Sequence, residues 1–158
     1  MDISIQTIRR ILEKDKSIPM ESLASQYLSL LAQLSPTTNQ DLSLSTFQTK
    51  IQEIHQYADI YVAIVRSNQI VGAATIFYEA KLIHGGNKYV GHIEDVVVDR
   101  AWRGNQIGQQ LLNVMLYDAE RLHDCYKVIL DCEEELADSF YGRVGFQRKC
   151  IQMAKYFI

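Results

Sequence analysis

The stretch Gly91–Gln109, GHIEDVVVDRAWRGNQIGQ, contains the features that decide the fold and the function of this 158-residue chain. Its first part ends in Val96, Val97 and Val98 and predicts a β-strand, because β-branched residues favour extended backbone. After Gly104 the apolar residues recur at helical spacing. The stretch therefore predicts a strand, a tight turn and a helix.

The rest of the chain predicts one α+β domain over residues 1–158, with no repeat, linker or low-complexity tract. Alternating or β-branched segments predict strands, and apolar residues three or four apart predict helices. Further strands are expected at 3–7, 60–66, 70–83, 127–132 and 146–157, and further helices at 20–34, 44–57 and 133–141. Turns are expected at 67–69 and 85–87. We therefore expect a mostly antiparallel central sheet flanked by helices.

Composition narrows the class of protein. A formal charge of −3 and a pI near 5.8 do not favour a nucleic-acid partner, and no apolar run is long enough to span a membrane. The first residues do not resemble a secretory signal. Cys125, Cys132 and Cys150 form no CxxC pair, so neither a disulfide framework nor a zinc site is expected. The histidines lack metal-ligand spacing, so no metal is predicted, and a cytoplasmic location is the simplest expectation.

The turn from Arg103 to Gly108, RGNQIG, is suited to an anion. The first N–H groups of a helix are unpaired and carry partial positive charge, and glycines let a phosphate approach the backbone. A Gly-Lys-Ser/Thr phosphate loop is absent, and so is the GxGxxG dinucleotide fingerprint. From the glycines alone, a tight turn without a ligand remains equally open.

The order of motifs resembles the GCN5-related N-acetyltransferase (GNAT) family. The match comprises a strand, Arg-x-x-x-x-Gly, a helix, a strand, a short helix and the stretch Phe140–Phe146, FYGRVGF. The resemblance implies the GNAT fold, with acetyl-CoA as co-substrate and its pyrophosphate on the backbone amides of the loop. The cofactor-binding residues it implies are Val96, Val97, Val98, Arg103, Gly104, Asn105, Gln106, Ile107, Gly108, Gln109, Tyr141, Gly142 and Arg143. Gln106 departs from the family pattern, which usually has a glycine there.

Three stretches are similar to the glucosamine 6-phosphate N-acetyltransferase branch of this family. They are GHIEDVVV at 91–98, CYKVILDC at 125–132 and KLIH at 81–84. This resemblance implies acetyl transfer to the amine of glucosamine 6-phosphate, giving N-acetylglucosamine 6-phosphate and CoA for UDP-N-acetylglucosamine synthesis. It also implies a homodimer in which the last strand and the long hairpin contribute to a shared active site.

The implied substrate-binding residues are Ser35, Lys81, His84, Glu94, Asp95, Tyr126, Lys127, Asp131 and Lys155. The family has a phosphate-binding arginine where this chain has Tyr156, with Lys155 one residue earlier. Tyr141 is the expected acid for the departing thiolate, since a phenol is protonated at neutral pH. Glu94 and Asp131 are the candidate catalytic carboxylates, and the identity of the base is left open. Glu94 and Asp95 are adjacent, so a regular strand would point them to opposite faces.

Two other readings stay open at this point. The same fold could act on another amine, such as a peptide, a lysine or a polyamine, because fold does not determine substrate. A non-catalytic acyl-CoA sensor would bind without turnover, although the presence of Tyr141 and Glu94 counts against it. A plain nucleotide-binding module would need a phosphate loop that this chain lacks.

Overall fold

The structure is a computed structural model that describes residues 2–83, 85–86 and 88–157. Its elements, in chain order, are β1 (Ile3–Thr7), α1 (Ile8–Arg10), the π-helical turn η1 (Ile11–Asp15), α2 (Met20–Ala32), α3 (Leu44–Ile54), β2 (Ala58–Val65), β3 (Ile70–Lys81), β4 (Lys88–Val98), the 3₁₀ turn η2 (Arg100–Trp102), α4 (Ile107–Arg121), β5 (Cys125–Leu130), α5 (Glu134–Ser139) and the 3₁₀ turn η3 (Tyr141–Val144). Among the described residues, no helix is long and apolar enough to cross a membrane.

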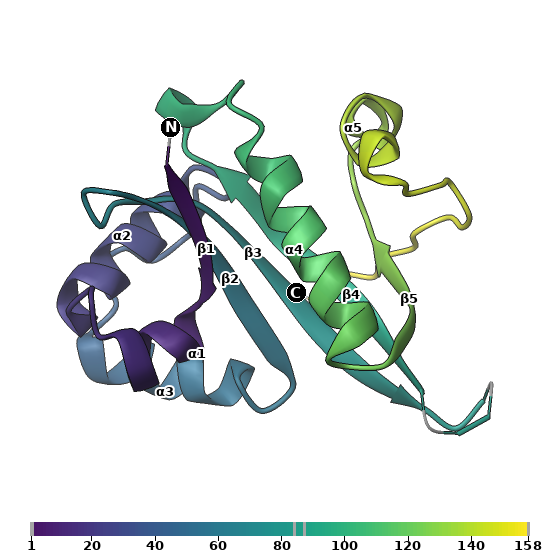
Figure 1. The fold of residues 1–158 in the computed structure, drawn as a ribbon, viewed down its shortest axis with the longest axis horizontal. Coiled ribbons are helices and arrows are strands. Elements are labelled where there is room, and N and C mark those ends of the chain that lie inside the picture. The colour runs from purple at the N-terminus through teal and green to yellow at the C-terminus, as the bar shows by residue number, and fades with distance from the viewer. Residues whose placement is uncertain (1, 84, 87, 158) are drawn as a thin grey trace.

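The five strands form one sheet in the order β1-β2-β3-β4-β5. The first three pairings are antiparallel and β4 pairs with β5 in parallel. The parallel pair requires a crossover, and α4 supplies it (Figure 1). The predicted mixed α+β architecture with a mostly antiparallel sheet is confirmed.

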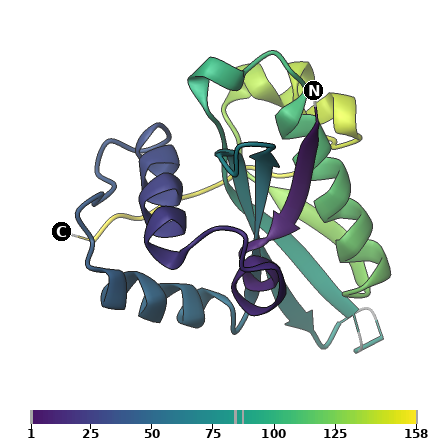
Figure 2. The same ribbon diagram turned by 60° about the vertical axis from the view of Figure 1, so that its left-hand side comes forward.

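Helices cover both faces of the sheet. Figure 2 shows α4 on one side and α2 and α3 on the other. The core is accordingly split into two clusters. On one face Leu23 and Tyr27 of α2 pack with Ala73 and Val97 of the sheet. On the other, Leu111 of α4 packs with strand residues such as Ile76 and Ile93. The helices α2, α3 and α4 each bury one apolar stripe, as the helical spacing in the sequence predicts.

The predicted last strand, at residues 146–157, is wrong. Residues 145–157 have no regular secondary structure, although they contain alternating apolar residues. We call residues 147–157 the C-terminal arm. Ile151, Met153, Tyr156 and Phe157 of this arm are each about 90 % exposed. A strand needs a neighbour for its backbone groups, and within the described part of this chain the arm has none.

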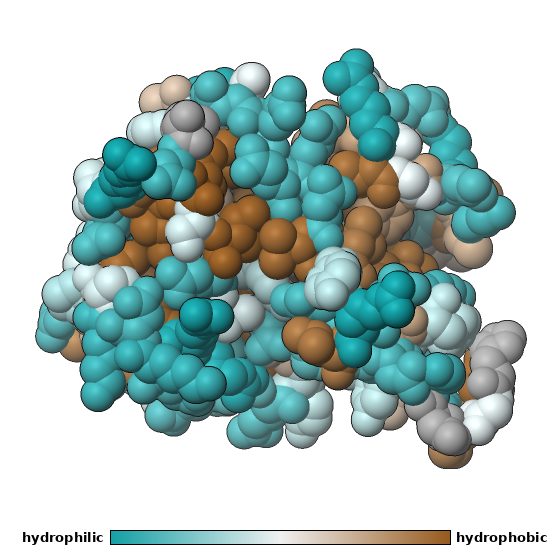
Figure 3. All heavy atoms as spheres, in the orientation of Figure 1, coloured by the Kyte–Doolittle hydropathy of each residue, from teal (hydrophilic) through white to brown (hydrophobic). Residues whose placement is uncertain are grey.

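Apolar side chains also reach the surface elsewhere. Figure 3 shows them as a band across the middle of the face seen in Figure 1, between polar groups. Leu82 and Ile83, at the end of the long β3–β4 hairpin, are 94 % and 61 % exposed. The hairpin turn predicted at 85–87 includes Asn87, which lies outside the described residues.

Candidate active site

The strand β4 separates from the edge strand β5 part of the way along its length. Their pairing ends at Ile93↔Leu130, whereas β4 continues to Val98 in its pairing with β3. The β5-facing edge of residues 94–98 therefore has no strand partner in the described part of the chain. Unpaired backbone N–H and C=O groups along such an edge can bind an extended ligand.

A β-bulge changes the direction of side chains at this position. Thr75 pairs with Glu94 and Ala73 pairs with Val97, so Asp95 and Val96 together oppose the single residue Ala74. Asp95 has a φ of +53°, in the left-handed region, as the extra residue of a bulge often does. Aspartate is one of the few residues that tolerates this conformation.

The bulge brings both acidic residues of the strand to one face. Glu94 is 3.2 Å from His92, two residues earlier on the same side of β4. Asp95 lies close enough to Tyr27 of α2 to help raise the pKa of that phenol. Both carboxylates therefore lie on the α2 side of the sheet. The expectation of opposite faces is wrong, because the register shift breaks the regular alternation.

Three polar side chains converge on this face where the strands separate. His92 Nε2 lies 3.2 Å from Glu94 Oε1 and 3.7 Å from Asp131 Oδ2. The same Asp131 oxygen accepts a hydrogen bond of 2.9 Å from Gln152 Nε2 in the C-terminal arm. Side-chain ligand atoms of His92, Glu94 and Asp131 all lie within 4.8 Å of one another. We call these three residues the acidic trio.

The spacing of histidines in the sequence gave no indication of the acidic trio, because Asp131 joins it only through β4–β5 pairing. The imidazole and the two carboxylates are groups that could also bind a divalent cation. Exposed acidic groups, however, commonly lie close together without a bound metal ion. Two carboxylates on one site are equally suited to an ammonium group with neighbouring hydroxyls.

Asp95 occupies a second acidic position beside the trio. Partial burial raises the pKa of its carboxyl above the ordinary 3.8. Tyr27, whose phenol is hydrogen-bonded to the Thr75 side chain, has its pKa raised to about 12, first by burial and then by the Asp95 charge. Tyr27 and Thr75 are polar neighbours of the site that the sequence did not single out.

The turn before α4 has the geometry of an anion cradle. Gly104 and Gln106 have φ values of +82° and +61°, and Gln106 is the N-cap of α4. Arg103 Nε donates to the Val98 carbonyl (3.1 Å) and so closes the turn back onto β4. The first N–H groups of the 15-residue α4 therefore point away from the helix with no partner inside it.

The backbone conformation of Gln106 shows what the replacement of the usual glycine changes at this position. The position requires a left-handed backbone, which glycine adopts without strain and glutamine adopts at a cost. Its side chain is exposed, so no atom of the core opposes it. The departure from the family pattern is therefore a local backbone strain and leaves the N–H in place.

Gly108 is required by close packing. A Cβ atom there would lie 2.8 Å from Phe140 Cζ and 3.6 Å from a methyl of Val98. The Phe140 ring in turn packs edge-on against Tyr141, with ring centroids 4.8 Å apart, and Tyr141 packs against Phe146. Gly108 thus lets α4 begin directly beside the segment that carries Tyr141.

Tyr141 is buried, with 7 % of its surface exposed. Burial, followed by the electrostatic interaction with the nearby Cys132 side chain, raises the pKa of its phenol from 10.0 to about 12. The phenol therefore stays protonated at neutral pH and can donate a proton or a hydrogen bond. Burial also raises the pKa of the Cys132 thiol, which favours the unreactive thiol form.

The remaining predicted site residues are more scattered. Lys81 Nζ pairs with Glu79 (2.5 Å), Ser35 shares a hydrogen bond with Thr37, and Lys155 Nζ lies 5.8 Å from the Phe157 ring centre. Gly142 and Arg143 are exposed on η3, and His84 lies outside the described residues. Val97 is buried in the core, so only its backbone could meet a ligand.

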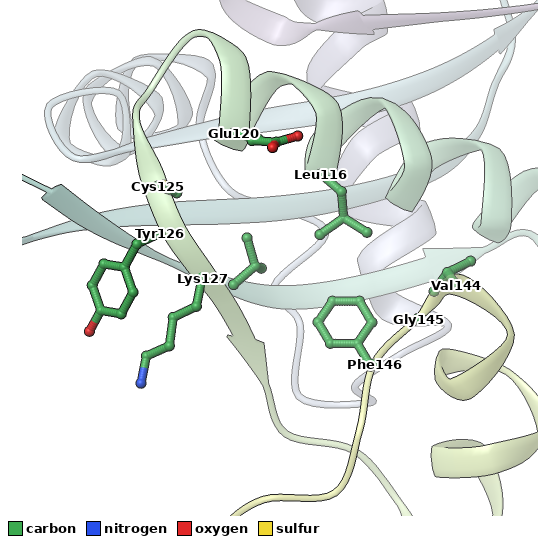
Figure 4. Close-up of a pocket in the computed structure, with 9 residues that line it drawn as sticks. Leu116, Glu120, Cys125, Tyr126, Lys127, Val144, Gly145 and Phe146 are labelled. Atoms are coloured by element: carbon green, nitrogen blue, oxygen red, sulfur yellow. The ribbon is translucent and has the colours of Figure 1, made fainter.

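A pocket of about 300 Å³ lies beside β5, and its lining includes no residue of the acidic trio (Figure 4). Its lining comes from α4 (Leu116, Glu120), from β5 and from the segment ending at Phe146. Figure 4 shows the Tyr126 and Lys127 side chains directed away from α4, and Lys127 Nζ lies 5.6 Å from the Tyr126 ring centre. The pocket contains no other predicted substrate residue.

Comparison with known proteins gives a consistent picture. The model of the acetyltransferase (GNAT) family matches residues 25–146. A probable glucosamine 6-phosphate N-acetyltransferase 2 of Oryza sativa subsp. japonica is 38 % identical over 137 residues, which are 83 % of this chain and 80 % of that protein. The glucosamine 6-phosphate N-acetyltransferase of Arabidopsis thaliana is 34 % identical over 91 % of this chain and 96 % of its own length.

Solved structures agree with the sequence relatives. A crystal structure of glucosamine-6-phosphate N-acetyltransferase from Arabidopsis thaliana superposes with a TM-score of 0.83 at 28 % identity and covers the whole of both chains. The fold, the family model and the relatives lead to one conclusion. The chain belongs to the GNAT family of acetyltransferases.

Proposed function

We propose that this protein transfers the acetyl group of acetyl-CoA to the amine of glucosamine 6-phosphate, giving N-acetylglucosamine 6-phosphate and CoA. The observation that carries the proposal is the acidic trio together with Asp95, placed where β4 leaves β5, in a chain 33–38 % identical to three plant enzymes named for this reaction. The trio offers carboxylates to an ammonium group and its neighbouring hydroxyls. The product is a precursor in UDP-N-acetylglucosamine synthesis.

The residues present fit acetyl-CoA. The anion cradle at Arg103–Gln109 would hold the pyrophosphate on backbone N–H groups, and Arg143 on η3 would add positive charge nearby. The open edge of residues 94–98 would pair with the extended pantetheine arm as a strand does. Gly108 keeps the start of α4 free of a side chain that would displace Phe140.

The proposed chemistry is direct transfer in a ternary complex. The ammonium group first loses a proton to Glu94 or Asp131, directly or through water. The neutral nitrogen attacks the thioester carbonyl carbon, and an N–H of residues 96–98 stabilises the oxyanion. The C–S bond then breaks, and Tyr141 donates its proton to the departing thiolate. The second proton of the nitrogen passes through water to the Tyr141 oxygen, which leaves a neutral amide and restores the phenol. Juxtaposition of amine and carbonyl supplies up to ~7–11 kcal/mol of the barrier reduction.

The phosphate of the sugar needs positive charge. Lys127 is directed away from α4 in Figure 4, Lys81 ends β3, and Lys155 lies on the arm, whereas His84 is outside the described residues. We propose that these side chains supply the phosphate contacts, with Tyr126 beside Lys127, and that Ser35 contacts the sugar. Tyr156 cannot provide the charge of the arginine that the family has in its place.

The C-terminal arm supports a homodimer. Its apolar residues are about 90 % exposed, and the outer edge of β5 has no strand partner in the described part of the chain. An exposed strand edge and an exposed apolar segment each favour association. We propose that the arm of one copy completes the sheet and the active site of the other. The single domain, residues 1–158, would be the repeating unit.

A panel of amines tests the proposed function. CoA release from acetyl-CoA would be followed with glucosamine 6-phosphate, glucosamine, a polyamine and lysine-containing peptides. The proposal expects turnover on glucosamine 6-phosphate, with a kcat/KM well above that on the other amines. Turnover on a peptide or polyamine but not on the amino sugar would overturn the substrate assignment.

A further inference from the structure

His92 is placed between the two carboxylates that the proposed reaction uses. Its Nε2 atom is 3.2 Å from Glu94 Oε1 and 3.7 Å from Asp131 Oδ2. The atom is shielded from solvent, and the Glu94 contact, although short, does not have the angles of a hydrogen bond. The imidazole therefore lies between the two carboxylates and is hydrogen-bonded to neither of them.

The surroundings determine which ring nitrogen carries the proton. An unprotonated Nε2 would place its lone pair near two carboxylate oxygens, which is repulsive. An Nε2–H is attractive to both of them, so the neighbouring charges hold the proton on Nε2. The opposite strand adds no charge here, because the β3 residue paired with His92 is Phe77. Beyond the trio, the charged neighbour on β4 is Asp95, and Gln152 of the arm reaches Asp131.

We propose that His92 is a positioning residue: an Nε2–H placed between Glu94 and Asp131 attracts both carboxylates, and this electrostatic bridge holds them converged on a single ammonium group. This inference rests on the proposed function and assigns a role to a residue outside the predicted site. Without the bridge, two carboxylates whose oxygens lie within 4.8 Å of His92 and of each other would repel. One of them would then hold a proton to higher pH and lose its attraction for the substrate.

The test compares His92→Leu, which removes the donor, with His92→Gln, whose Nε2 amide can donate from a similar position. His123→Leu is the matched control, since His123 Nε2 lies 3.6 Å from Asp59 Oδ2 and its side chain is equally exposed, 33 % against 34 % for His92. For each variant, kcat and KM for glucosamine 6-phosphate and for acetyl-CoA are measured across the acid limb of the pH profile.

We expect His92→Leu to raise KM for the amino sugar roughly tenfold and to move the acid limb of kcat/KM upward by about one pH unit, with KM for acetyl-CoA unchanged. His92→Gln should restore most of both effects, and His123→Leu should move neither. An unmoved acid limb in His92→Leu would overturn the proposal. Equal losses in His92→Leu and His92→Gln would also overturn it, because they indicate packing rather than a donor.

A readout without turnover separates this inference from the proposed function. Carbon-13 NMR titration of the side-chain carboxylates in His92→Leu should show one carboxylate of the Glu94–Asp131 pair titrating at higher pH than in the unsubstituted protein. Identical titration curves would contradict the bridging role even in an active enzyme. Failure of the unsubstituted protein to acetylate glucosamine 6-phosphate would reject the proposed function and leave the titration to decide the role of His92.

Discussion

Tyr141 shows how a residue identified from a motif acquires its chemistry from its environment. The sequence placed it at the end of a short helix, and the structure buries it against Phe140 and Phe146. Burial raises the pKa of its phenol to about 12, which keeps the oxygen protonated at neutral pH, as the proposed acid role requires.

Replacing Tyr141 with Phe removes the phenolic proton and keeps the ring packing. We expect kcat to fall by roughly 10²–10⁴-fold, the usual contribution of a general acid, with little change in KM for either substrate. Steady-state kinetics with glucosamine 6-phosphate is the measurement. Activity equal to that of the unsubstituted protein would remove the acid role from Tyr141.

The raised pKa values of Tyr27 and Tyr141 also predict an alkaline loss of stability. Both phenols have folded-state values of about 12 against an ordinary 10.0, so the folded state holds its protons longer than the unfolded state. The stability is therefore fully present below pH 10 and is lost as pH rises through about 12. In Tyr27→Phe, the free energy of unfolding measured with denaturant should fall less steeply as the pH rises through this window. A slope unchanged by that substitution would contradict the assignment.

The left-handed backbone of the anion cradle makes opposite predictions for two neighbouring residues. Gln106→Gly should leave stability unchanged or raise it by up to about 1 kcal/mol, because glycine adopts a φ of +61° without strain. Gly104→Ala should cost about 1 kcal/mol at a φ of +82°, although no atom obstructs the added methyl group. Urea unfolding of both variants measures the difference. A destabilised Gln106→Gly would show that the side chain has a structural role.

At the scale of the element, β4 carries the feature that most affects the site. The bulge at Asp95 places Glu94 and Asp95 on the α2 face and turns Val96 and Val98 towards the α4 core. Periodicity in the sequence predicted the strand and its end. It could not predict the bulge, because a one-residue register shift depends on the partner strand β3.

Two uncharged substitutions at Asp95 separate the backbone requirement of the bulge from the effect of the carboxylate charge. Asp95→Asn retains a residue that tolerates the left-handed region and should keep near-normal stability, while Asp95→Val should cost about 1–2 kcal/mol. Thermal unfolding of the two variants gives the comparison. Equal stability of the Asn and Val variants would argue that the strand can run without the bulge.

The difference between structure that local sequence specifies and structure that depends on a distant partner strand explains which elements were predictable. The helices α2 and α3 and the hairpin of β2 and β3 were identified to within a few residues, because local spacing and turn residues specify them. The acidic trio was predicted in part, because Glu94 and Asp131 came from motifs and His92 was missed. Gln152, which donates a hydrogen bond to Asp131 from the arm, was missed as well. Those two join the site through strand pairing and through the arm, and neither contact leaves a local signal in the sequence.

At the scale of the whole molecule, the C-terminal arm is the unsatisfied part of the structure. Arg148 anchors its beginning through ion pairs with Glu134 (2.6 Å) and Asp138 (3.0 Å) of α5. Beyond Gln152 the apolar residues face solvent, although alternating hydrophobicity predicted a strand. The wrong prediction and the proposed dimer have one cause, since a strand forms only when another backbone pairs with it.

Removal of residues 151–158 should convert the proposed homodimer into a monomer and lower activity, because each arm is proposed to complete the partner's site. Sedimentation equilibrium and CoA release measure the two effects. Ile151→Ser with Met153→Ser is the milder comparison, as it keeps the backbone and removes two apolar contacts. A monomeric full-length protein with full activity would contradict the shared site.

The central claim is the identity of the acceptor, and a competition measures it most directly. The protein would be offered acetyl-CoA with equal concentrations of glucosamine 6-phosphate, a polyamine and a lysine-containing peptide, and the acetylated products would be quantified by mass spectrometry. We expect N-acetylglucosamine 6-phosphate to be the dominant product. Acetylated peptide or polyamine in its place, with the amino sugar left unmodified, would contradict the account.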